Sequence, residues 1–227
     1  MTVMNKSVII VAGGKGLRMG TEVPKQFLLL EGLPIIIHTI LQFVKALGDL
    51  EVILVLPEDH VPYWESLVKE HGFEVPHKVV NGGPTRFHSV KNGLAQITGQ
   101  GIVGIHDAVR PLVSKATIHR CYQNAAEQGN AIPAIAITDS LRIVEKGINK
   151  WVDRSMYRRI QTPQVFQNWL IQEAFRQDYS DSFTDDASVL ETLGYDINLV
   201  DGNEENIKIT QPADLILARA TLKAKSL

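Results

Sequence analysis

The chain is organised around the stretch SVIIVAGGKGLRMG at residues 7–20, which continues to PKQ at residues 24–26. Residues 8–12 are apolar and mostly β-branched, a pattern typical of a strand that is buried on both faces. Four glycines follow within residues 13–20, where they allow a sharp turn and a close approach of the backbone to a ligand. The sequence therefore predicts a buried strand that ends in a ligand-binding loop.

The loop carries cations that suit a polyphosphate, namely Lys15, Arg18 and Lys25. It differs from two familiar glycine fingerprints. A P-loop lysine is followed by Ser or Thr rather than by Gly16, and a dinucleotide fingerprint needs glycine where Met19 stands. The glycines alone leave open a plain tight turn without phosphate chemistry. Because the cations favour an anion, we expect a triphosphate site here.

The bulk composition is that of one ordinary globular domain. The chain has 227 residues, of which 44% are hydrophobic and 21% charged. A net charge of -2 gives no general attraction to nucleic acid or membranes, so we expect a small anionic substrate held by local cations. We also expect no signal peptide, no membrane span and a cytoplasmic location, with the single Cys121 packed as a small hydrophobe rather than acting as a nucleophile or a ligand.

The hydrophobic pattern alternates between strands and helices. We expect strands at residues 8–12, 51–56, 77–80, 102–105 and 131–137, and helices at 33–47, 60–71, 85–97 and 114–128. This alternation predicts an α/β fold with a mostly parallel sheet flanked by helices. A second group of elements follows residue 159, with helices at 168–176, 185–193 and 211–225 and a strand at 197–200.

The alternation breaks at residues 138–159, which predict a protruding hairpin around residues 146–149. Its exposed apolar side chains would form a surface for a partner. The acidic residues between 178 and 186 lack the spacing of a calcium loop, and we expect Asp185 to cap a helix there.

Several polar side chains are predicted to meet the glycine loop at the carboxyl edge of the sheet. Asp107 follows the strand at 102–105, and there it could hold Mg²⁺ directly or through water, or simply cap a helix. Arg86 and Ser89 lie one turn apart near a helix start, which is either an anion-binding edge or a solvated first turn. Lys208 stands between two isoleucines, so its side chain points away from theirs and toward a site.

The loop motif AGGxGxRM, followed by PKQ, resembles the signature of the sugar-phosphate and alditol-phosphate nucleotidyltransferases. The sequence PKQF narrows this resemblance to the 2-C-methyl-D-erythritol 4-phosphate cytidylyltransferases. Later motifs agree with it: GGxxRxxSV at residues 82–90, HDAVRP at 106–111, VDR at 152–154, TPQ at 162–164, TDDAS at 184–188 and NIKIT at 206–210.

The resemblance spans nearly the whole chain, and it implies a single Rossmann-like nucleotidyltransferase domain over residues 1–227. In the family, the arm at residues 138–159 embraces a second subunit, so a homodimer is expected. The implied reaction transfers CMP from CTP to 2-C-methyl-D-erythritol 4-phosphate in the non-mevalonate isoprenoid pathway. The products are 4-diphosphocytidyl-2-C-methyl-D-erythritol and pyrophosphate.

The resemblance also assigns roles to residues. The CTP-binding set is Ala12, Gly13, Gly14, Lys15, Gly16, Gly82, Arg86, Ser89 and Asp107. Arg18 and Lys25 would stabilise the charge that builds on the α-phosphorus, and Asp107 would organise Mg²⁺. Arg154, supplied by the partner subunit's arm, and Lys208 would position the acceptor phosphate. The polyol would contact Arg110, Ser140 and Thr162.

Two departures keep a neighbouring family open, the ribitol 5-phosphate cytidylyltransferases that make CDP-ribitol. The loop has Ala12-Gly13-Gly14 where Ala-Ala-Gly is usual, and Ser140 replaces a threonine of the acceptor pocket. The run at residues 186–188 instead favours methylerythritol phosphate. A non-catalytic nucleotide-binding regulator is a remote alternative, because such a module has no need for the second pair of cations, Arg154 and Lys208.

Overall fold

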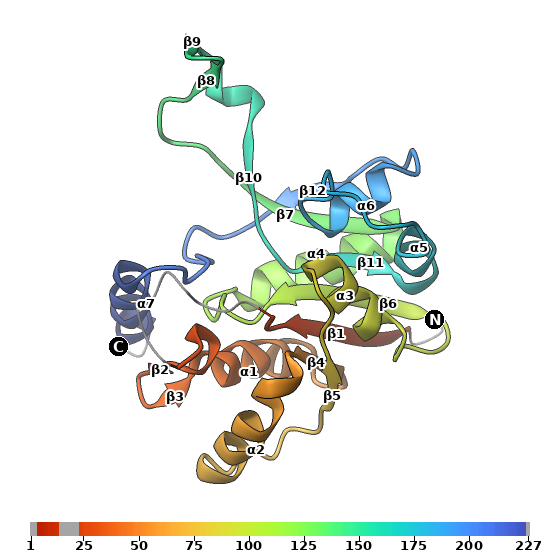
Figure 1. The fold of residues 1–227 in the computed structure, drawn as a ribbon, viewed down its shortest axis with the longest axis vertical. Helices are drawn as coiled ribbons and strands as arrows, with labels where there is room; N and C mark the ends of the chain where they lie inside the picture. Colours follow the sequence, from red (N-terminus) through yellow and green to blue (C-terminus); the bar gives the residue numbers. More distant parts are fainter. Residues whose placement is uncertain (1–3, 14–22, 226–227) are drawn as a thin grey trace.

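The computed structural model describes residues 4–13 and 23–225. Its centre is an eight-stranded sheet in the order β10-β7-β11-β6-β1-β4-β5, with β12 paired to β7 (Figure 1). The strands are β1 (Asn5–Val11), β4 (Glu51–Leu56), β5 (Lys78–Asn81), β6 (Gly101–Asp107), β7 (Asn130–Ala136), β10 (Arg158–Ile160), β11 (Gln164–Gln167) and β12 (Leu199–Asp201). Strand β1 lies parallel to both β4 and β6, as the buried run at residues 8–12 predicts. The mostly parallel sheet is therefore confirmed, with β11 antiparallel to β6 and β7.

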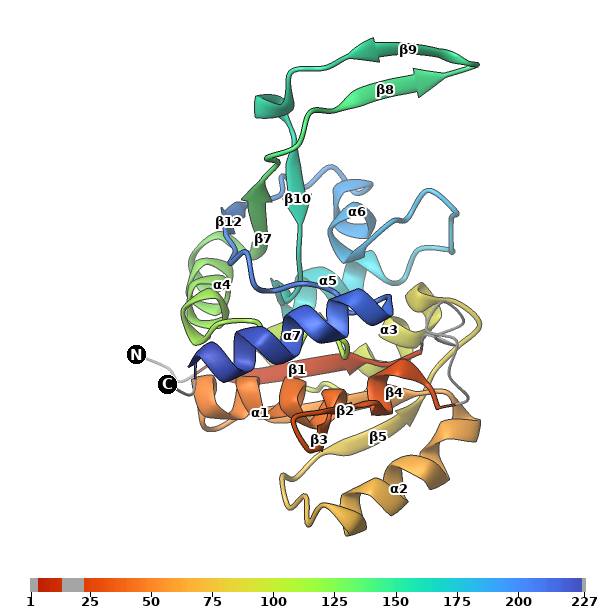
Figure 2. The ribbon, with the colours of Figure 1, turned by 90° about the vertical axis from the view of Figure 1, so that its left-hand side faces the viewer.

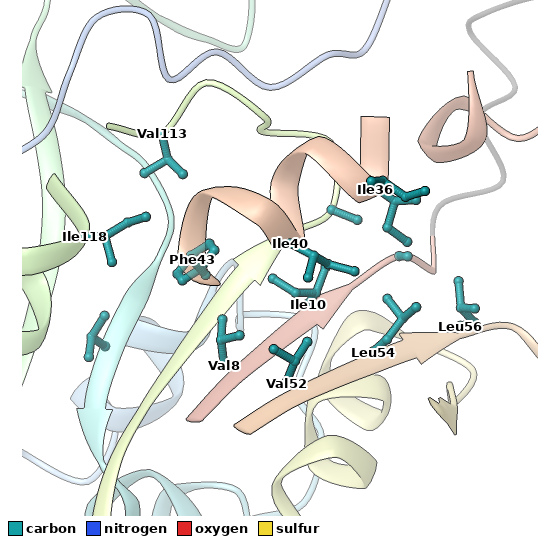
Figure 3. Close-up of a cluster of buried hydrophobic side chains, with 14 of the residues drawn as sticks. Val8, Ile10, Ile36, Ile40, Phe43, Val52, Leu54, Leu56, Val113 and Ile118 are labelled. Atoms are coloured by element: carbon teal, nitrogen blue, oxygen red, sulfur yellow. The ribbon is translucent and has the colours of Figure 1, made fainter. Parts of the chain in front are cut away.

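Alternate residues of β1 point to opposite faces of the sheet, and each face has its own core. Val8 and Ile10 pack under helices α1 (Ile35–Leu47), α2 (Val61–Glu70) and α4 (Lys115–Gln128). Figure 3 shows this core, with Phe43 of α1 above the strands. Ile9 and Val11 pack on the other face under α3 (Arg86–Leu94), α5 (Asn168–Ala174) and α6 (Asp186–Glu191).

A smaller core lies beneath the last helix, α7 (Pro212–Lys225). Leu30, Ile35 and Ile209 are fully buried in it, and the N–H of Ile209 donates to the carbonyl of Val109 at 2.9 Å, so the chain before α7 is held against the segment that follows β6. Figure 2 shows α7 lying along the body of the molecule beside α1. Among the described residues, no helix is long and apolar enough to cross a bilayer.

Helix ends differ from the predicted ones for local reasons. The first helix begins at Ile35 rather than at residue 33, because β3 (Leu33–Pro34) pairs with β2 (Leu29–Leu30) across a tight turn. Positive φ angles at Glu31 (49°) and Gly32 (86°) match the turn type that such two-residue hairpins require. The helix expected at 85–97 ends at Leu94, and those expected at 168–176 and 185–193 end at Ala174 and Glu191.

The predicted hairpin is present as β8 (Arg142–Glu145) and β9 (Ile148–Trp151), joined by a turn with positive φ at Lys146 and Gly147. Figure 2 shows it as an arm that projects far from the sheet. Val144 is 70% exposed and Trp151 is 74% exposed. The arm therefore presents apolar surface that none of the described residues of its own chain covers.

Candidate active site

Two adjoining cavities lie at the carboxyl edge of the sheet, where β1 and β6 end. Each has a volume of about 330 Å³. We name each cavity after the role that the resemblance implies for its residues. The first, the nucleotide-side cavity, is lined by Val11, Ala12, Gly13, Lys25, Gln26, Gly83, Pro84, Thr85, Arg86, Ser89, Asp107, Val109 and Lys208. The second, the acceptor-side cavity, is lined by Arg86, Asp107, Arg110, Ile160, Gln161, Thr162, Gln164, Thr184, Asp185 and Lys208. Arg86, Asp107 and Lys208 therefore form a boundary that the two cavities share.

Asp107, the last residue of β6, faces three cations. Its carboxylate lies 3.7 Å from Arg86 Nε, 3.2 Å from Arg110 Nε and 3.1 Å from Lys208 Nζ. Burial alone would raise the pKa of Asp107, but the charges of Arg86, Lys208 and Arg110 outweigh it and hold this pKa well below its usual range. Asp107 is therefore ionised at every physiological pH, and the cluster keeps an excess of positive charge for an anionic ligand.

A buried polar chain holds the end of β6 in place. The backbone N–H of Asp107 donates to Thr162 Oγ1 at 3.1 Å, and this hydroxyl lies 2.9 Å from His106 Nδ1. His106 Nε2 lies 3.1 Å from the carbonyl of Arg110, which can only accept, so Nε2 carries the hydrogen. Complete burial lowers the pKa of His106 to about 3. The imidazole is therefore neutral, and Nδ1 accepts the hydroxyl proton of Thr162.

The turn before α3 is built around Ser89. Its hydroxyl accepts from the backbone N–H of Gly83 at 3.1 Å and donates to the carbonyl of Thr85 at 3.0 Å. A Cβ on Gly83 would lie 2.4 Å from the Cβ of His88, so only glycine fits there. Gly82 donates its own amide to Leu56 at 2.7 Å. Ser89 and Gly83 thus line the nucleotide-side cavity, whereas Gly82 supports the turn behind it.

The PKQ segment forms a short 3₁₀ helix, Lys25–Phe27, against the start of the glycine loop. Gln26 is 1% exposed, and its side-chain amide donates to the carbonyl of Ala12 at 3.0 Å. This bond fixes the exit of β1 beside Lys25, which lines the nucleotide-side cavity. Four further predicted residues, Gly14, Lys15, Gly16 and Arg18, lie outside the described residues.

The arm keeps two predicted acceptor residues away from the site of their own chain. Arg154 and Ser140 are exposed and line neither cavity, and Arg154 donates to the carbonyl of Thr138 within the arm. Thr162, Arg110 and Lys208 do line the acceptor-side cavity, as the resemblance implies. A single chain therefore assembles part of the predicted acceptor set.

Sequence reasoning missed two buried side chains that organise the site. Asp186 binds Arg86 through both carboxylate oxygens, at 2.7 Å each. Gln164 donates to Asp185 at 2.7 Å and accepts from the N–H of Ala187 at 2.8 Å. Both residues stand in motifs, TPQ and TDDAS, but no local pattern indicates which distant partner each would bind. Asp185 caps α6 by accepting from Ser188 N at 2.9 Å, so that prediction is confirmed.

Within the described residues, no group of three or more His, Cys, Asp or Glu side chains is arranged to hold a metal ion. Asp107 offers a single ionised carboxylate at the boundary of the cavities. A divalent cation held there would need its other oxygen ligands from phosphate and water, which is the usual mode for Mg²⁺ bound with a nucleotide.

Comparisons with known proteins point to one family. A protein from Bacteroides thetaiotaomicron, called 2-C-methyl-D-erythritol 4-phosphate cytidylyltransferase, is 48% identical over 219 residues, covering 96% of this chain and 100% of the relative. A protein of the same name from Porphyromonas gingivalis is 48% identical over 215 residues, covering 94% of this chain and 96% of the relative.

Solved structures show the same likeness. The 4-diphosphocytidyl-2C-methyl-D-erythritol synthase of Anaerococcus prevotii superposes with a TM-score of 0.82 at 27% identity, covering 97% of this chain and 96% of the other. The 2-C-methyl-D-erythritol 4-phosphate cytidylyltransferase of Thermus thermophilus superposes with a TM-score of 0.76 at 33% identity, covering 97% of this chain and 100% of the other. The model of the IspD family, 2-C-methyl-D-erythritol 4-phosphate cytidylyltransferase, matches residues 6–224, and the chain belongs to this family.

Proposed function

We propose that this enzyme transfers CMP from CTP to 2-C-methyl-D-erythritol 4-phosphate and releases pyrophosphate. One observation carries the proposal. Two cavities of similar size adjoin at the carboxyl edge of the sheet, and they share a boundary made of Arg86, Asp107 and Lys208. Two phosphorylated reactants can thus meet across cations that belong to both cavities. This transfer is a step of the non-mevalonate route to isoprenoid precursors.

The reaction requires that the acceptor phosphate and the α-phosphorus of CTP be aligned and that the negative charge of the phosphates be neutralised. The acceptor phosphate attacks the α-phosphorus of CTP in line, and the bond to the departing pyrophosphate breaks. Lys25 in the nucleotide-side cavity, together with Arg18, stabilises the negative charge on the five-coordinate phosphorus, and Lys15 holds the outer phosphates. Lys208 holds the acceptor phosphate at the shared boundary. No covalent enzyme intermediate is needed.

We further propose that Mg²⁺ enters with the nucleotide and that Asp107 contributes one oxygen ligand. Three cations already surround this carboxylate, so a bare divalent ion is disfavoured unless phosphates accompany it. The ion would neutralise phosphate charge as the transfer proceeds. With or without the ion, Arg86 and Lys208 hold the carboxylate of Asp107 at the boundary between the two cavities.

The arm supports a homodimer in which Arg154 completes the partner's site. Its exposed apolar residues, Val144 and Trp151 among them, need a covering surface. Arg154 lies in the arm rather than in its own chain's cavities. A cytoplasmic location fits a nucleotide-dependent enzyme whose single cysteine, Cys121, is buried and free of any disulfide.

The experiment that tests the function is a matrix of two nucleotides and two acceptors. CTP and UTP are each assayed with 2-C-methyl-D-erythritol 4-phosphate and with ribitol 5-phosphate, and pyrophosphate release is followed in the presence of magnesium. We expect the largest kcat/KM for CTP with methylerythritol phosphate. A larger value with ribitol 5-phosphate would assign that compound as the acceptor, the alternative suggested by the Ala12-Gly13-Gly14 loop. Nucleotide binding with no pyrophosphate release in any of these combinations would mean that the protein is a non-catalytic nucleotide-binding regulator.

A further inference from the structure

A buried ion pair between Asp186 and Arg86 links helix α6 to helix α3 beside the site. Asp186, the first residue of α6, is 1% exposed. Its Oδ1 accepts from Arg86 Nη1 and its Oδ2 from Arg86 Nη2, each at 2.7 Å. Arg86 is the first residue of α3 and lies 100 positions earlier in the sequence. A bidentate pair of this kind fixes the direction of the guanidinium as well as its distance.

The start of α6 is itself firmly held. Asp185 accepts from the N–H of Ser188 at 2.9 Å, and the hydroxyl of Ser188 accepts from the N–H of Asp185 at 3.1 Å. Gln164 of β11 bonds both Asp185 and the N–H of Ala187. The carboxylate of Asp186 therefore sits on a segment tied to the central sheet, and it can serve as a fixed reference point for Arg86.

The direction of the guanidinium matters because Arg86 belongs to both cavities. Its Nε lies 3.7 Å from Asp107, and its side chain is 33% exposed at their boundary. Asp186 and Asp107 thus compete for one cation. Without Asp186, Coulomb attraction would draw the guanidinium toward Asp107 and change the charge that both substrates meet. Asp186 itself lines neither cavity, so it acts on ligands only through Arg86.

We propose that Asp186 is a positioning residue that aims Arg86 at the boundary between the nucleotide-side and acceptor-side cavities. It sets the relative placement of α3 and α6, and with it the alignment of the two phosphates. This role rests on the proposed cytidylyl transfer. Asp186 would serve that reaction without touching either substrate.

A double-mutant cycle tests the role. Asp186→Asn, Arg86→Gln and the double variant are assayed for kcat/KM with each substrate, beside thermal unfolding of each protein. We expect each single change to lower kcat/KM about 10-fold or more, because small misalignments in phosphoryl transfer are costly. In the Arg86→Gln background, Asp186→Asn should cost less than about 3-fold further, since the residue through which it acts is already gone. Losses that multiply would overturn the proposal.

Two further variants separate positioning from folding. Asp186→Glu keeps the charge and the pair but shifts the guanidinium by one methylene, so a folded protein with reduced kcat/KM is expected, and wild-type kcat/KM would overturn the role. Asp178→Asn makes the same chemical change as Asp186→Asn at an exposed position of the preceding segment, and it should leave activity and melting unchanged. A wild-type enzyme that transfers no CMP would refute the proposed function instead, which keeps the two failures distinct.

Discussion

At the scale of single residues, the site is a balance of charges around Asp107. The described lining of the two cavities carries the cations Lys25, Arg86, Arg110 and Lys208. They face the carboxylates of Asp107 and Asp185 and that of Asp186 behind Arg86, so a small positive excess remains. Residue types and motif order were enough to predict that Asp107, Arg86 and Lys208 would share a site. The contacts that set their charge and direction, above all that of Asp186 with Arg86, join positions 100 residues apart and depend on the packing of α3 against α6.

Lys25 and Lys208 should show different kinetic defects. Lys25 stabilises charge that develops in the transition state, so Lys25→Ala should lower kcat and kcat/KM together by on the order of 100-fold. The affinity of the Lys25→Ala variant for CTP should change little. Lys208 holds a phosphate already charged in the ground state, so Lys208→Ala should mainly raise the KM for the acceptor.

Calorimetric titration with CTP and magnesium, beside initial rates against acceptor concentration, distinguishes the two lysines. Lys69→Ala, an exposed lysine of α2, is the matched control and should behave as wild type. If Lys25→Ala loses CTP binding while turnover of the bound complex is preserved, Lys25 is a nucleotide anchor and the assigned role is wrong.

His106 should make the enzyme less stable in mild acid. Burial lowers its pKa from 6.5 to about 3, so between these values the unfolded chain binds a proton that the folded protein excludes. The contribution of neutral His106 to stability is therefore fully present well above pH 6.5, and the free energy of unfolding decreases as the pH falls below that value. From pH 7 to pH 5 this one group should cost about 2 kcal/mol.

Urea unfolding of wild type and His106→Gln at pH 7, 6 and 5 measures this effect, because contributions from other groups cancel in the difference. The variant should lose less stability over the same interval. Parallel pH profiles for the two proteins would mean that His106 does not exclude the proton.

At the scale of elements, the sequence pattern predicted the fold well. Residues 8–12 form a strand buried on both faces because β1 lies between β4 and β6, and the alternation up to residue 137 gave the order of strands and helices. The pattern could not predict the antiparallel β11, since a short apolar run has no direction of its own. Nor could it place the ends of α3 and α5, where the chain tightens into i→i+3 backbone hydrogen bonds, such as those from Ile97 to Leu94 and from Gln177 to Ala174.

The turn before α3 should require glycine at position 83. A Cβ there would meet His88 at 2.4 Å, so Gly83→Ala must shift the turn that Ser89 holds. We expect CTP affinity to fall about 10-fold or more, with lower thermal stability. Gly99→Ala is a control for stability alone. It has φ of 76° and open space around it, so it should cost about 1 kcal/mol from backbone strain and leave CTP affinity unchanged. Equal CTP affinity in Gly83→Ala and wild type would contradict this account of the turn.

For the molecule as a whole, the position of the arm determines whether one chain can form a complete active site. Figure 1 shows β8 and β9 far from the carboxyl edge of β1, and Arg154 lies in that arm. Lys208 and Thr162 reach the acceptor-side cavity from the body, whereas Ser140 and Arg154 do not. The resemblance implies that the partner subunit supplies Arg154, but a short motif does not itself distinguish a site within one chain from a site shared between two chains. The shared site therefore stays a prediction.

Subunit mixing should restore activity between two inactive variants. If Arg154 acts across a dimer interface, mixtures of Arg154→Ala and Lys25→Ala chains will contain heterodimers in which one of the two sites is complete. Activity should rise toward one quarter of the wild-type level in an equal mixture that has exchanged subunits. No recovery, with exchange verified by mass spectrometry of tagged chains, would place Arg154 in its own chain's site or outside any site.

Isotope labelling of the acceptor phosphate tests whether this phosphate attacks the α-phosphorus of CTP. 2-C-methyl-D-erythritol 4-phosphate with ¹⁸O in its non-bridging phosphate oxygens is incubated with CTP, magnesium and the enzyme, and the products are examined by ³¹P NMR. The account predicts that all of the label stays in the nucleotide product, with one labelled oxygen bridging the two phosphorus atoms, and that pyrophosphate carries none. Label in pyrophosphate, or unlabelled bridging oxygen in the product, would contradict it.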